Sequence, residues 1–588
     1  MKQFQKYGLA AAVATASASA LAVSGANTER SDQNLGDAAI VPYYTTTGGK
    51  VTGVHIINTT SATQVVKFRM RRGKDSRDAM DFNIVMSPKD EWVTSIQTNA
   101  NPSAGKGGVK LITDDTTCTA PIFDADGTLA EIPATYAEGA EEGYIEIIGM
   151  GQADATTAGA TAAAMKAGTV NGNPINAAAK HVKGVPADCA AVEYNCLRVA
   201  DADAGDADTL GVHHSELTNQ VSSQGSTGLT SYSDTPDRAL KVSWFIRDAD
   251  GGLEVGGNAV HIEGFADAAM MTNQEQLEFN TAGLVKYDPF NFELPNLNQG
   301  SYPSASRTSN HDGSSTGNAE TLFNRVRAVM GVDAVHNDWS DKTTDGSTVD
   351  TDWVVTLPGQ YISEDPFCVI YAGYPVDGKA CTASTALDLS ETEIPLYLID
   401  KTGASQFSLY SREEDVLVDK AAQAPAGLDF SPSNSAEKAP DSVTMDREVN
   451  VLVFQRAGEE STGVLESAAG QAFTLPAAAD DIDNGWMSLN ITPSGTGAQF
   501  KVNGHGSTAT TTDCSTSTTQ QGCGVPVSTG TTRTYGAFED ASTDGDTVAI
   551  AMAVWKREFG DNPAAAYGRA VEHSYTLSSG FDEAGRYK

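Results

Sequence analysis

The amino-acid sequence predicts a mostly β protein made of several antiparallel β-sandwich modules, with acidic loop insertions and few short helices. Apolar and polar residues alternate along short segments, so that one set of side chains faces a core and the other faces the opposite side of a sheet. Clusters of Thr, Ser, Asn, Asp and Gly separate these segments and supply turns. The pattern continues to the C-terminus without a fixed repeat period, which favours immunoglobulin-like sandwiches over a propeller or solenoid.

The clearest alternation lies between Leu35 and Ile96, where three strands are predicted. Turn-forming residues at 45–49, 58–61 and 87–90 separate or bound these strands. The residues predicted to face the core are Val54 and Ile56 in the first strand, Val66, Phe68 and Met70 in the second, and Met80, Phe82, Ile84 and Met86 in the third.

Later segments continue the pattern at irregular spacing. The further predicted strands are 143–149, 239–246, 353–357, 367–374, 394–399, 449–454, 486–491 and 548–555. A short helix is predicted over 318–330, which opens with Asn318 and carries Leu322, Val326 and Val329. Small and large residues alternate in Val548–Trp555, as expected of a strand packed on both faces, and this last block could join the first sandwich.

The 588 residues are enough for about three or four domains. The predicted division is a signal peptide at 1–26, an N-terminal β-sandwich at 27–150, an insertion rich in Ala, Asp and Thr at 151–225, a second β-rich domain at 226–360, a third at 361–475, and a C-terminal β-rich region with a Ser/Thr-rich loop at 476–588.

The N-terminus has the features of an export signal. Lys2 and Lys6 precede a run of small apolar residues at 8–23, and Ser24-Gly25-Ala26 resembles a signal-peptidase site. No later segment reaches the roughly 18 apolar residues of a membrane helix. We therefore expect a secreted protein with no membrane span, located at the outer cell surface or in the extracellular matrix.

The chain is strongly acidic, with 76 Asp and Glu against 39 Lys and Arg and a formal net charge of −37. Such a surface repels phosphate backbones, so nucleic acid is not an expected partner. The self-repulsion of so many carboxylates is relieved by salt, by calcium or by pairing with the few basic residues.

Seven cysteines are expected to pair mostly as disulfides in an oxidising compartment. Cys368 with Cys381 and Cys514 with Cys523 are close in sequence and are predicted to close two loops. Cys118 then pairs with Cys189 or Cys196, or else Cys189 and Cys196 pair locally and Cys118 stays free. Their spacing shows no zinc motif.

Calcium is the cofactor that the sequence best motivates. Asp124 and Asp126, Asp248 and Asp250, and Asp544 and Asp546 flank or precede glycine turns, where alternate carboxylates can converge on a hard cation. Asp201, Asp203, Asp206 and Asp208 form a denser run. The alternative is that Asp-Gly pairs simply make good hairpin turns.

Basic residues gather in the second predicted strand and the turn after it. Lys67, Arg69 and Arg71 alternate with its core residues and are predicted to project to solvent, followed by Arg72. Guanidinium groups match phosphate and carboxylate bidentately, so this face could bind lipopolysaccharide or a neighbouring subunit. The alternative is a solvated face balanced by Asp75 and Asp78.

Enzyme motifs are weak, and the chain is expected not to be an enzyme. Gly313–Gly317 spells GxSxG but lies in a polar stretch rather than on a strand-to-helix turn. His213, His214 and Glu216 lack the spacing of a zinc protease motif. Aromatic residues make up only 7% of the chain, which disfavours a sugar-binding cleft.

Three blocks resemble exported cell-surface proteins of marine Gammaproteobacteria, among them surface-layer proteins of the biofilm matrix. They are 35–59 with 81–88, Thr351–Thr356, and Ala553–Trp555. The resemblance implies a structural surface-layer protein that self-assembles into a lattice on the outer-membrane surface and contributes to the biofilm matrix. A secreted adhesin or matrix-binding protein is the alternative, and a secreted hydrolase is a third possibility.

Overall fold

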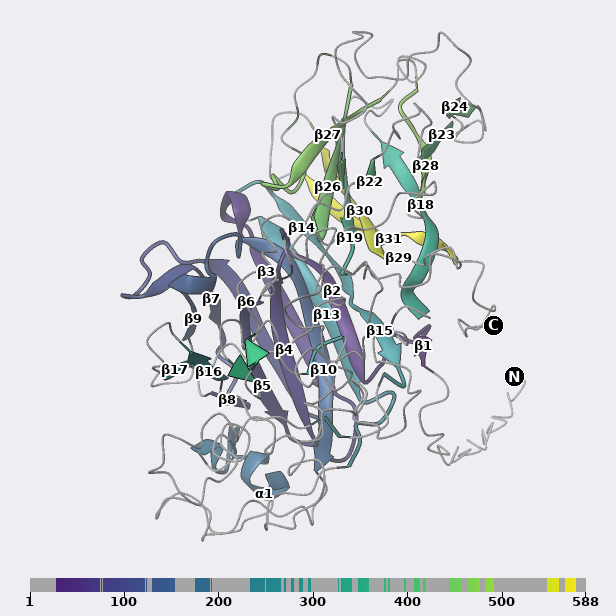
Figure 1. The fold of residues 1–588 in the computed structure, drawn as a ribbon. Helices are drawn as coiled ribbons and strands as arrows, with labels where there is room; N and C mark the ends of the chain where they lie inside the picture. Colours follow the sequence, from purple (N-terminus) through teal and green to yellow (C-terminus); the bar gives the residue numbers. More distant parts are fainter. Residues whose placement is uncertain are drawn as a thin grey trace, which may run out of the picture.

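The computed structural model describes residues 28–121, 129–153, 175–190, 233–265, 329–340, 347–358, 407–412, 447–456, 463–475, 482–490, 547–559 and 566–577, with single-residue gaps inside some ranges, and several shorter pieces. The predicted signal peptide lies outside the described residues. The protein is mostly β, as the sequence predicts. Two pairs of larger sheets make up its body, and Figure 1 shows them one above the other.

The first sandwich contains most of the chain before residue 264. One sheet has the order β1-β15-β2-β10-β4-β5-β8 and the other the order β14-β13-β3-β6-β7-β9, with all neighbours antiparallel. The bounds are β1 Glu29–Arg30, β2 Ala38–Thr45, β3 Val51–Asn58, β4 Thr63–Arg72, β5 Asp78–Met86, β6 Glu91–Thr98, β7 Lys106–Ile112, β8 Cys118–Ala120, β9 Leu129–Pro133, β10 Glu142–Ala153, β13 Leu240–Asp248, β14 Leu253–Asn258 and β15 Val260–Glu263.

The core between these sheets confirms the predicted alternation. Phe68 and Phe82 stack with ring centroids 5.0 Å apart, and Trp92 on β6 meets the Phe68 ring edge-on at 5.4 Å. Val54, Ile56, Met70 and Ile84 are fully buried in the same cluster. At roughly 1.5–3 kcal/mol for each large apolar side chain, these residues supply much of the driving force for folding.

The strands do not follow the predicted domain boundaries. β13 lies within 226–360, yet it pairs with β3, so that Val242 faces Ile56 across the two strands. β15 from the same range pairs with β2. The first sheet pair therefore includes strands from this later range.

The second sandwich is built from the later strands. Its sheets have the orders β24-β23-β28-β18-β29, with β32 also on β18, and β27-β26-β19-β30-β31; only the β26–β27 pair is parallel. The bounds are β18 Gly331–Ser340, β19 Thr348–Thr356, β23 Phe407–Ser411, β24 Val416–Val418, β26 Val449–Gln455, β27 Gly470–Thr474, β28 Asn484–Asn490, β29 Thr547–Val548, β30 Ile550–Glu558, β31 Tyr567–Glu572 and β32 Ser574–Leu577. The immunoglobulin-like strand topology stays a prediction.

Small elements complete the described chain. They are the 3-10 turns Thr47–Gly49 and Ala134–Tyr136, α1 Ile175–Ala179, and the paired short strands β11 His181–Val182 with β12 Val185–Pro186, β16 Gln276–Phe279 with β17 Val285–Asp288, β20 Pro375–Val376 with β21 Lys379–Ala380, and β22 Leu396–Tyr397 with β25 Thr444–Met445. No helix in the described part of the chain has the length and apolar character needed to cross a membrane.

β30 belongs to both cores, which confirms that this strand is packed on both faces. Its large residues Ile550, Met552 and Val554 lie in the core that includes the first sandwich. Ala551 and Ala553 face the core of the second sandwich beside Trp353. The yellow β30 accordingly lies among the green strands of the upper sandwich in Figure 1, although it comes from the far end of the chain.

The loop before β27 fastens the second sandwich to the first. Lys50 Nζ lies 3.1 Å from Glu466 Oε2, and Glu142 accepts hydrogen bonds from Ser467 Oγ at 2.6 Å and from the Ala469 N–H at 2.9 Å. The Leu465 N–H donates to Asp352 Oδ2 at 2.8 Å. These contacts, with β30, make the two sandwiches one packed body.

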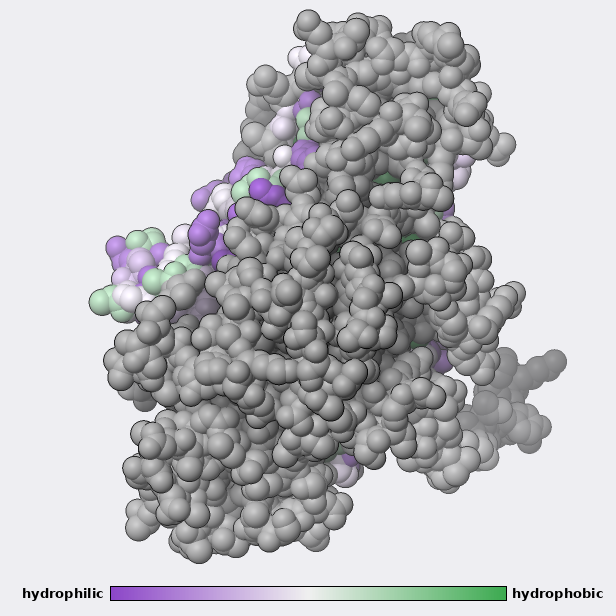
Figure 2. Space-filling view, viewed as in Figure 1, coloured by the Kyte–Doolittle hydropathy of each residue, from purple (hydrophilic) through white to green (hydrophobic). Residues whose placement is uncertain are grey.

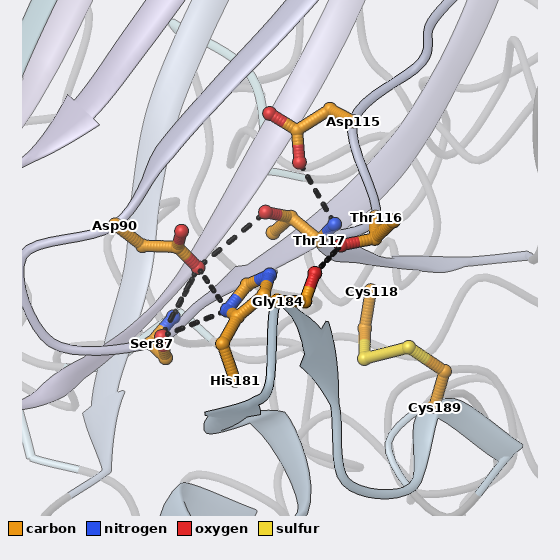
Figure 3. Close-up of a disulfide and its surroundings, with 9 residues drawn as sticks. All are labelled: Ser87, Asp90, Asp115, Thr116, Thr117, Cys118, His181, Gly184 and Cys189. Atoms are coloured by element: carbon orange, nitrogen blue, oxygen red, sulfur yellow. Dashed lines mark hydrogen bonds and ion pairs between the residues drawn. A yellow bond between two sulfur atoms is a disulfide. The ribbon is translucent and has the colours of Figure 1, made fainter.

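A disulfide ties the insertion to the first sandwich. Cys118 on β8 forms a disulfide with Cys189, as Figure 3 shows. Cys189 comes shortly after β12, the second strand of the hairpin that follows α1. This confirms one of the two pairings left open for Cys118. The predicted pairs Cys368–Cys381 and Cys514–Cys523 lie outside the described residues.

Candidate ligand-binding cleft

The predicted solvent-exposed basic face is wrong. Lys67, Arg69 and Arg71 are at most 1% exposed, and Arg72 is 8% exposed. Alternation correctly places the first three opposite Phe68 and Met70, but the second face of this sheet is buried as well. An ion needs a charged partner in such a place, since its isolated burial costs several kcal/mol.

The partners come from both neighbouring strands. Arg69 lies opposite Asp81 on β5 and Glu146 on β10 in the strand register. Its Nη1 atom contacts both Asp78 carboxylate oxygens at 2.9 Å, and Lys67 Nζ lies 2.6 Å from Asp81 Oδ1.

Arg71 closes the same cluster. Its Nε atom lies 3.2 Å from Glu146 Oε1, and its Nη1 atom lies 2.9 Å from Asp78 Oδ1. Three cations thus face three carboxylates, and burial still lowers the pKa of Lys67 to about 8. Because this cluster is charge-balanced and buried, we no longer assign it to lipopolysaccharide or subunit binding.

The structure describes one of the predicted calcium turns, and there Asp248 caps a hairpin. Asp248 Oδ1 accepts the N–H groups of Asp250 and Gly251 at 3.1 and 2.7 Å, and its Oδ2 lies 3.9 Å from Lys50 Nζ. This geometry favours the turn alternative. Among the described residues no three His, Cys, Asp or Glu side chains gather as a metal site. Asp124, Asp126, Asp544 and Asp546 lie outside them, as do the Asp201–Asp208 run, the His213–Glu216 cluster and Gly313–Gly317.

A Ser, His and Asp meet beside the disulfide, but not as a catalytic triad (Figure 3). Ser87 Oγ and Asp90 Oδ2 lie 3.4 and 3.6 Å from the same ring nitrogen of His181, Nδ1. A triad needs the nucleophile on one ring nitrogen and the carboxylate on the other. The Ser87 hydroxyl instead donates to Asp90, and partial burial raises the pKa of that carboxyl.

The described residues of the second sandwich form a cleft of about 680 Å³. Both sheets line it. The lining residues are Asp338, Trp339, Ser340, Arg412, Asp483, Asn484, Gly485 and Trp486 from the β18 sheet, and Val349, Trp555, Arg557, Tyr567 and Arg569 from the β19 sheet. This volume lies within the range of about 300–1,000 Å³ that is typical of small-ligand sites.

The β19 sheet contributes a wall of alternating aromatic and arginine side chains. Cross-strand pairing sets Trp555 on β30 opposite Arg569 on β31, and Arg557 opposite Tyr567. The Arg569 guanidinium lies 5.3 Å from the Trp555 ring centroid. Arg557 donates from Nε to Ser347 Oγ at 2.9 Å and lies over the Phe559 ring at 4.9 Å. These contacts hold both guanidinium groups at the cleft.

The β18 sheet contributes an aromatic platform. Trp486 on β28 is 39% exposed and stacks on Tyr410 of β23, with centroids 4.1 Å apart and planes 11° from parallel. Asp338 lies opposite Trp486 on the other neighbouring strand. Stacking on Tyr410 fixes the Trp486 ring, and Trp486 is the member of the pair that lines the cleft, with polar groups beside it.

The cleft differs in charge from the whole chain. Three arginines and two aspartates line it, whereas acidic residues outnumber basic ones 76 to 39 overall. In the first sandwich, the described residues near β7 and β9 mix hydrophilic and hydrophobic side chains on the face shown in Figure 2.

Sequence reasoning missed this site. Its arginines are spread over residues 412–569 and come from different strands, so no motif connects them. The low aromatic content disfavoured a sugar-binding cleft, but aromatic residues need only be concentrated in one place. A usable signal is the stretch from Trp555 to Arg557 at the end of the last apolar block, where the composition of the strand changes from apolar to aromatic and basic.

Comparison of the chain with protein-family models, with curated proteins and with solved structures finds no match.

Proposed function

We propose that this chain is an exported cell-surface protein that binds extracellular polysaccharide through the cleft of its second sandwich. The observation that carries the proposal is the exposed Trp486 ring, which stacks on Tyr410 and lines an open cleft together with polar side chains. Sugar rings have an apolar face of C–H groups that stacks on aromatic rings, and their hydroxyls bond to nearby polar groups. The predicted export signal and the Cys118–Cys189 disulfide support an extracellular location.

Native gel electrophoresis in gels that contain a soluble polysaccharide tests this proposal. Uncharged dextran, polygalacturonate and dextran sulfate serve as three separate probes. We expect at least one of them to retard the full-length mature protein, and Trp486→Ala to abolish the retardation. Val182→Ala, which changes an exposed apolar side chain on the β11–β12 hairpin, is the matched control. Migration unaffected by all three probes would refute the proposal.

Assembly into a surface-layer lattice on the outer membrane is the second candidate. Its support is the resemblance, the export signal and the acidic composition, with calcium as the proposed bridge between carboxylates. Burial of Lys67, Arg69 and Arg71 removes the contact face first considered for it. Electron microscopy of cell surfaces and purified protein, with and without a calcium chelator, tests it. Ordered sheets that dissolve on chelation support a lattice, and persistent monomers in calcium and high salt contradict it.

A further inference from the structure

We propose that the ligand of the cleft is an acidic glycan, whose carboxylate or sulfate groups bind Arg569 while a sugar ring stacks on Trp486. This inference rests on the proposed polysaccharide binding and names the class of polysaccharide. It follows from the charge, geometry and exposure of the cleft arginines.

The charge of the lining selects for an anion. Basic residues are half as frequent as acidic ones in the chain, yet arginines outnumber aspartates three to two at the cleft. All three basic residues are arginine, which offers a planar fork of donors to carboxylate or sulfate. A neutral sugar needs no such concentration of guanidinium groups.

Two of the arginines are not neutralised by described carboxylates. Arg412 and Arg569 are exposed, and neither forms an ion pair with any Asp or Glu in the described part of the chain. The buried arginines of β4 differ, because Asp78 and Glu146 contact them directly. An anion that enters the cleft can therefore pair with Arg569 without first displacing a described carboxylate.

Aromatic contacts hold the cleft arginines for this task. A guanidinium that lies over a ring keeps the N–H groups at its edge available for hydrogen bonds. Arg569 lies over Trp555 in this way. Less side-chain freedom is lost when such a preorganised group binds a ligand.

Isothermal titration of the full-length mature protein with defined oligosaccharides tests the inference. The probes are tetragalacturonate, a sulfated dextran oligosaccharide and uncharged maltotetraose. We expect one acidic probe to bind at least tenfold more tightly than maltotetraose, and Arg569→Ala to remove about tenfold of that affinity. The preferred acidic probe distinguishes a carboxylate ligand from a sulfated one.

Arg247→Ala is the matched control, because Arg247 is an exposed strand arginine of the first sandwich that lies 4.0 Å from Glu254. It should leave the affinity unchanged. Equal affinity for acidic and neutral probes, or unchanged acidic binding by Arg569→Ala, would overturn the acidic ligand while leaving polysaccharide binding intact. Failure to bind any probe would overturn both proposals. Unfolding curves of each variant show whether a lost affinity reflects a lost fold.

Discussion

Two groups of arginines occupy opposite environments in this protein. On β4, Arg69 and Arg71 are buried and contact Asp78 and Glu146. At the cleft, Arg557 and Arg569 sit against aromatic rings, and Arg569 is exposed. The first group neutralises carboxylates of its own sheet, whereas Arg569 in the second group presents its guanidinium group to solvent.

The difference shows that clustering of charge in sequence does not identify a binding surface. The β4 residues are close in sequence because they alternate on one strand, and their partners come from the two flanking strands. The cleft arginines are distant in sequence and meet only because β30 and β31 pair and the two sheets face each other. A charged group that is already paired has little to offer a ligand.

The largest expected effect is the loss of stability in Arg69→Ala. This change leaves Asp78 and Glu146 without one of their cations at a buried site, and breaking such a pair costs roughly 3–5 kcal/mol. Urea unfolding followed by circular dichroism measures the free energy of unfolding. Arg247→Ala, at an exposed pair, should cost less than about 1 kcal/mol. Equal costs for the two variants would show that the β4 cluster is open to water.

Much of the fold could be predicted from the sequence where alternation alone decides the structure. The strands around Phe68, Phe82 and Ile56 form as predicted, because their apolar residues have a single core to face. The small and large residues of Ile550–Val554 correctly indicated two packed faces. Alternation could not show that the polar face of β4 is also covered, since that depends on contacts from distant parts of the chain.

The candidate site could not be predicted for the same physical reason. Trp486, Trp555 and Arg569 lie on three strands of two sheets, and only the strand order brings them to one cleft. The pairing of β13 with β3 was also missed, because nothing local marks Leu240–Asp248 as a partner of a strand about 190 residues earlier. Long-range pairing is information that a strand pattern does not contain.

The next effect concerns Asp352, a fully buried residue on β19. Its carboxyl group lies between the two sandwiches. Burial raises the pKa of Asp352 to about 7. The hydrogen bond from the Leu465 N–H stabilises the carboxylate and lowers the pKa, but its effect is smaller than that of burial. The folded state therefore holds this proton up to about pH 7, while the unfolded chain releases it near pH 4. Across that window the contribution of Asp352 to stability falls as pH rises, by at most about 1.4 kcal/mol per pH unit.

Asp352→Asn removes this titration. We expect the unfolding free energy of the variant, relative to the unmodified protein, to increase between pH 4 and pH 7 and to level off above. His261 acts in the opposite direction, because burial lowers its pKa to about 4, but it is common to both proteins. Urea unfolding at a series of pH values measures the difference. A flat difference for Asp352→Asn contradicts a buried, protonated carboxyl.

A smaller effect on stability is expected for Arg569→Ala. Because its side chain is exposed and meets only the Trp555 ring among the interactions of the described residues, we expect a change within about 0.5–1 kcal/mol in the free energy of unfolding. The same urea titration measures it. A cost close to that of Arg69→Ala would place Arg569 in the framework of the sandwich rather than at a binding surface.

The smallest expected effect tests whether the negative charge of Asp338 opposes the positive charge of the cleft arginines. Asp338 lies opposite Trp486 and repels an acidic ligand, so Asp338→Asn should tighten the binding of the preferred acidic oligosaccharide by a few-fold, which corresponds to about 1 kcal/mol or less. Because salt screens exposed charges, the gain should shrink between about 0.1 M and 1 M salt, where the Debye length falls from about 10 to 3 Å. Binding of uncharged maltotetraose should not change. Weaker binding of both probes would instead assign Asp338 as an acceptor for sugar hydroxyls, and the cleft would then select its ligand by hydrogen bonding more than by charge.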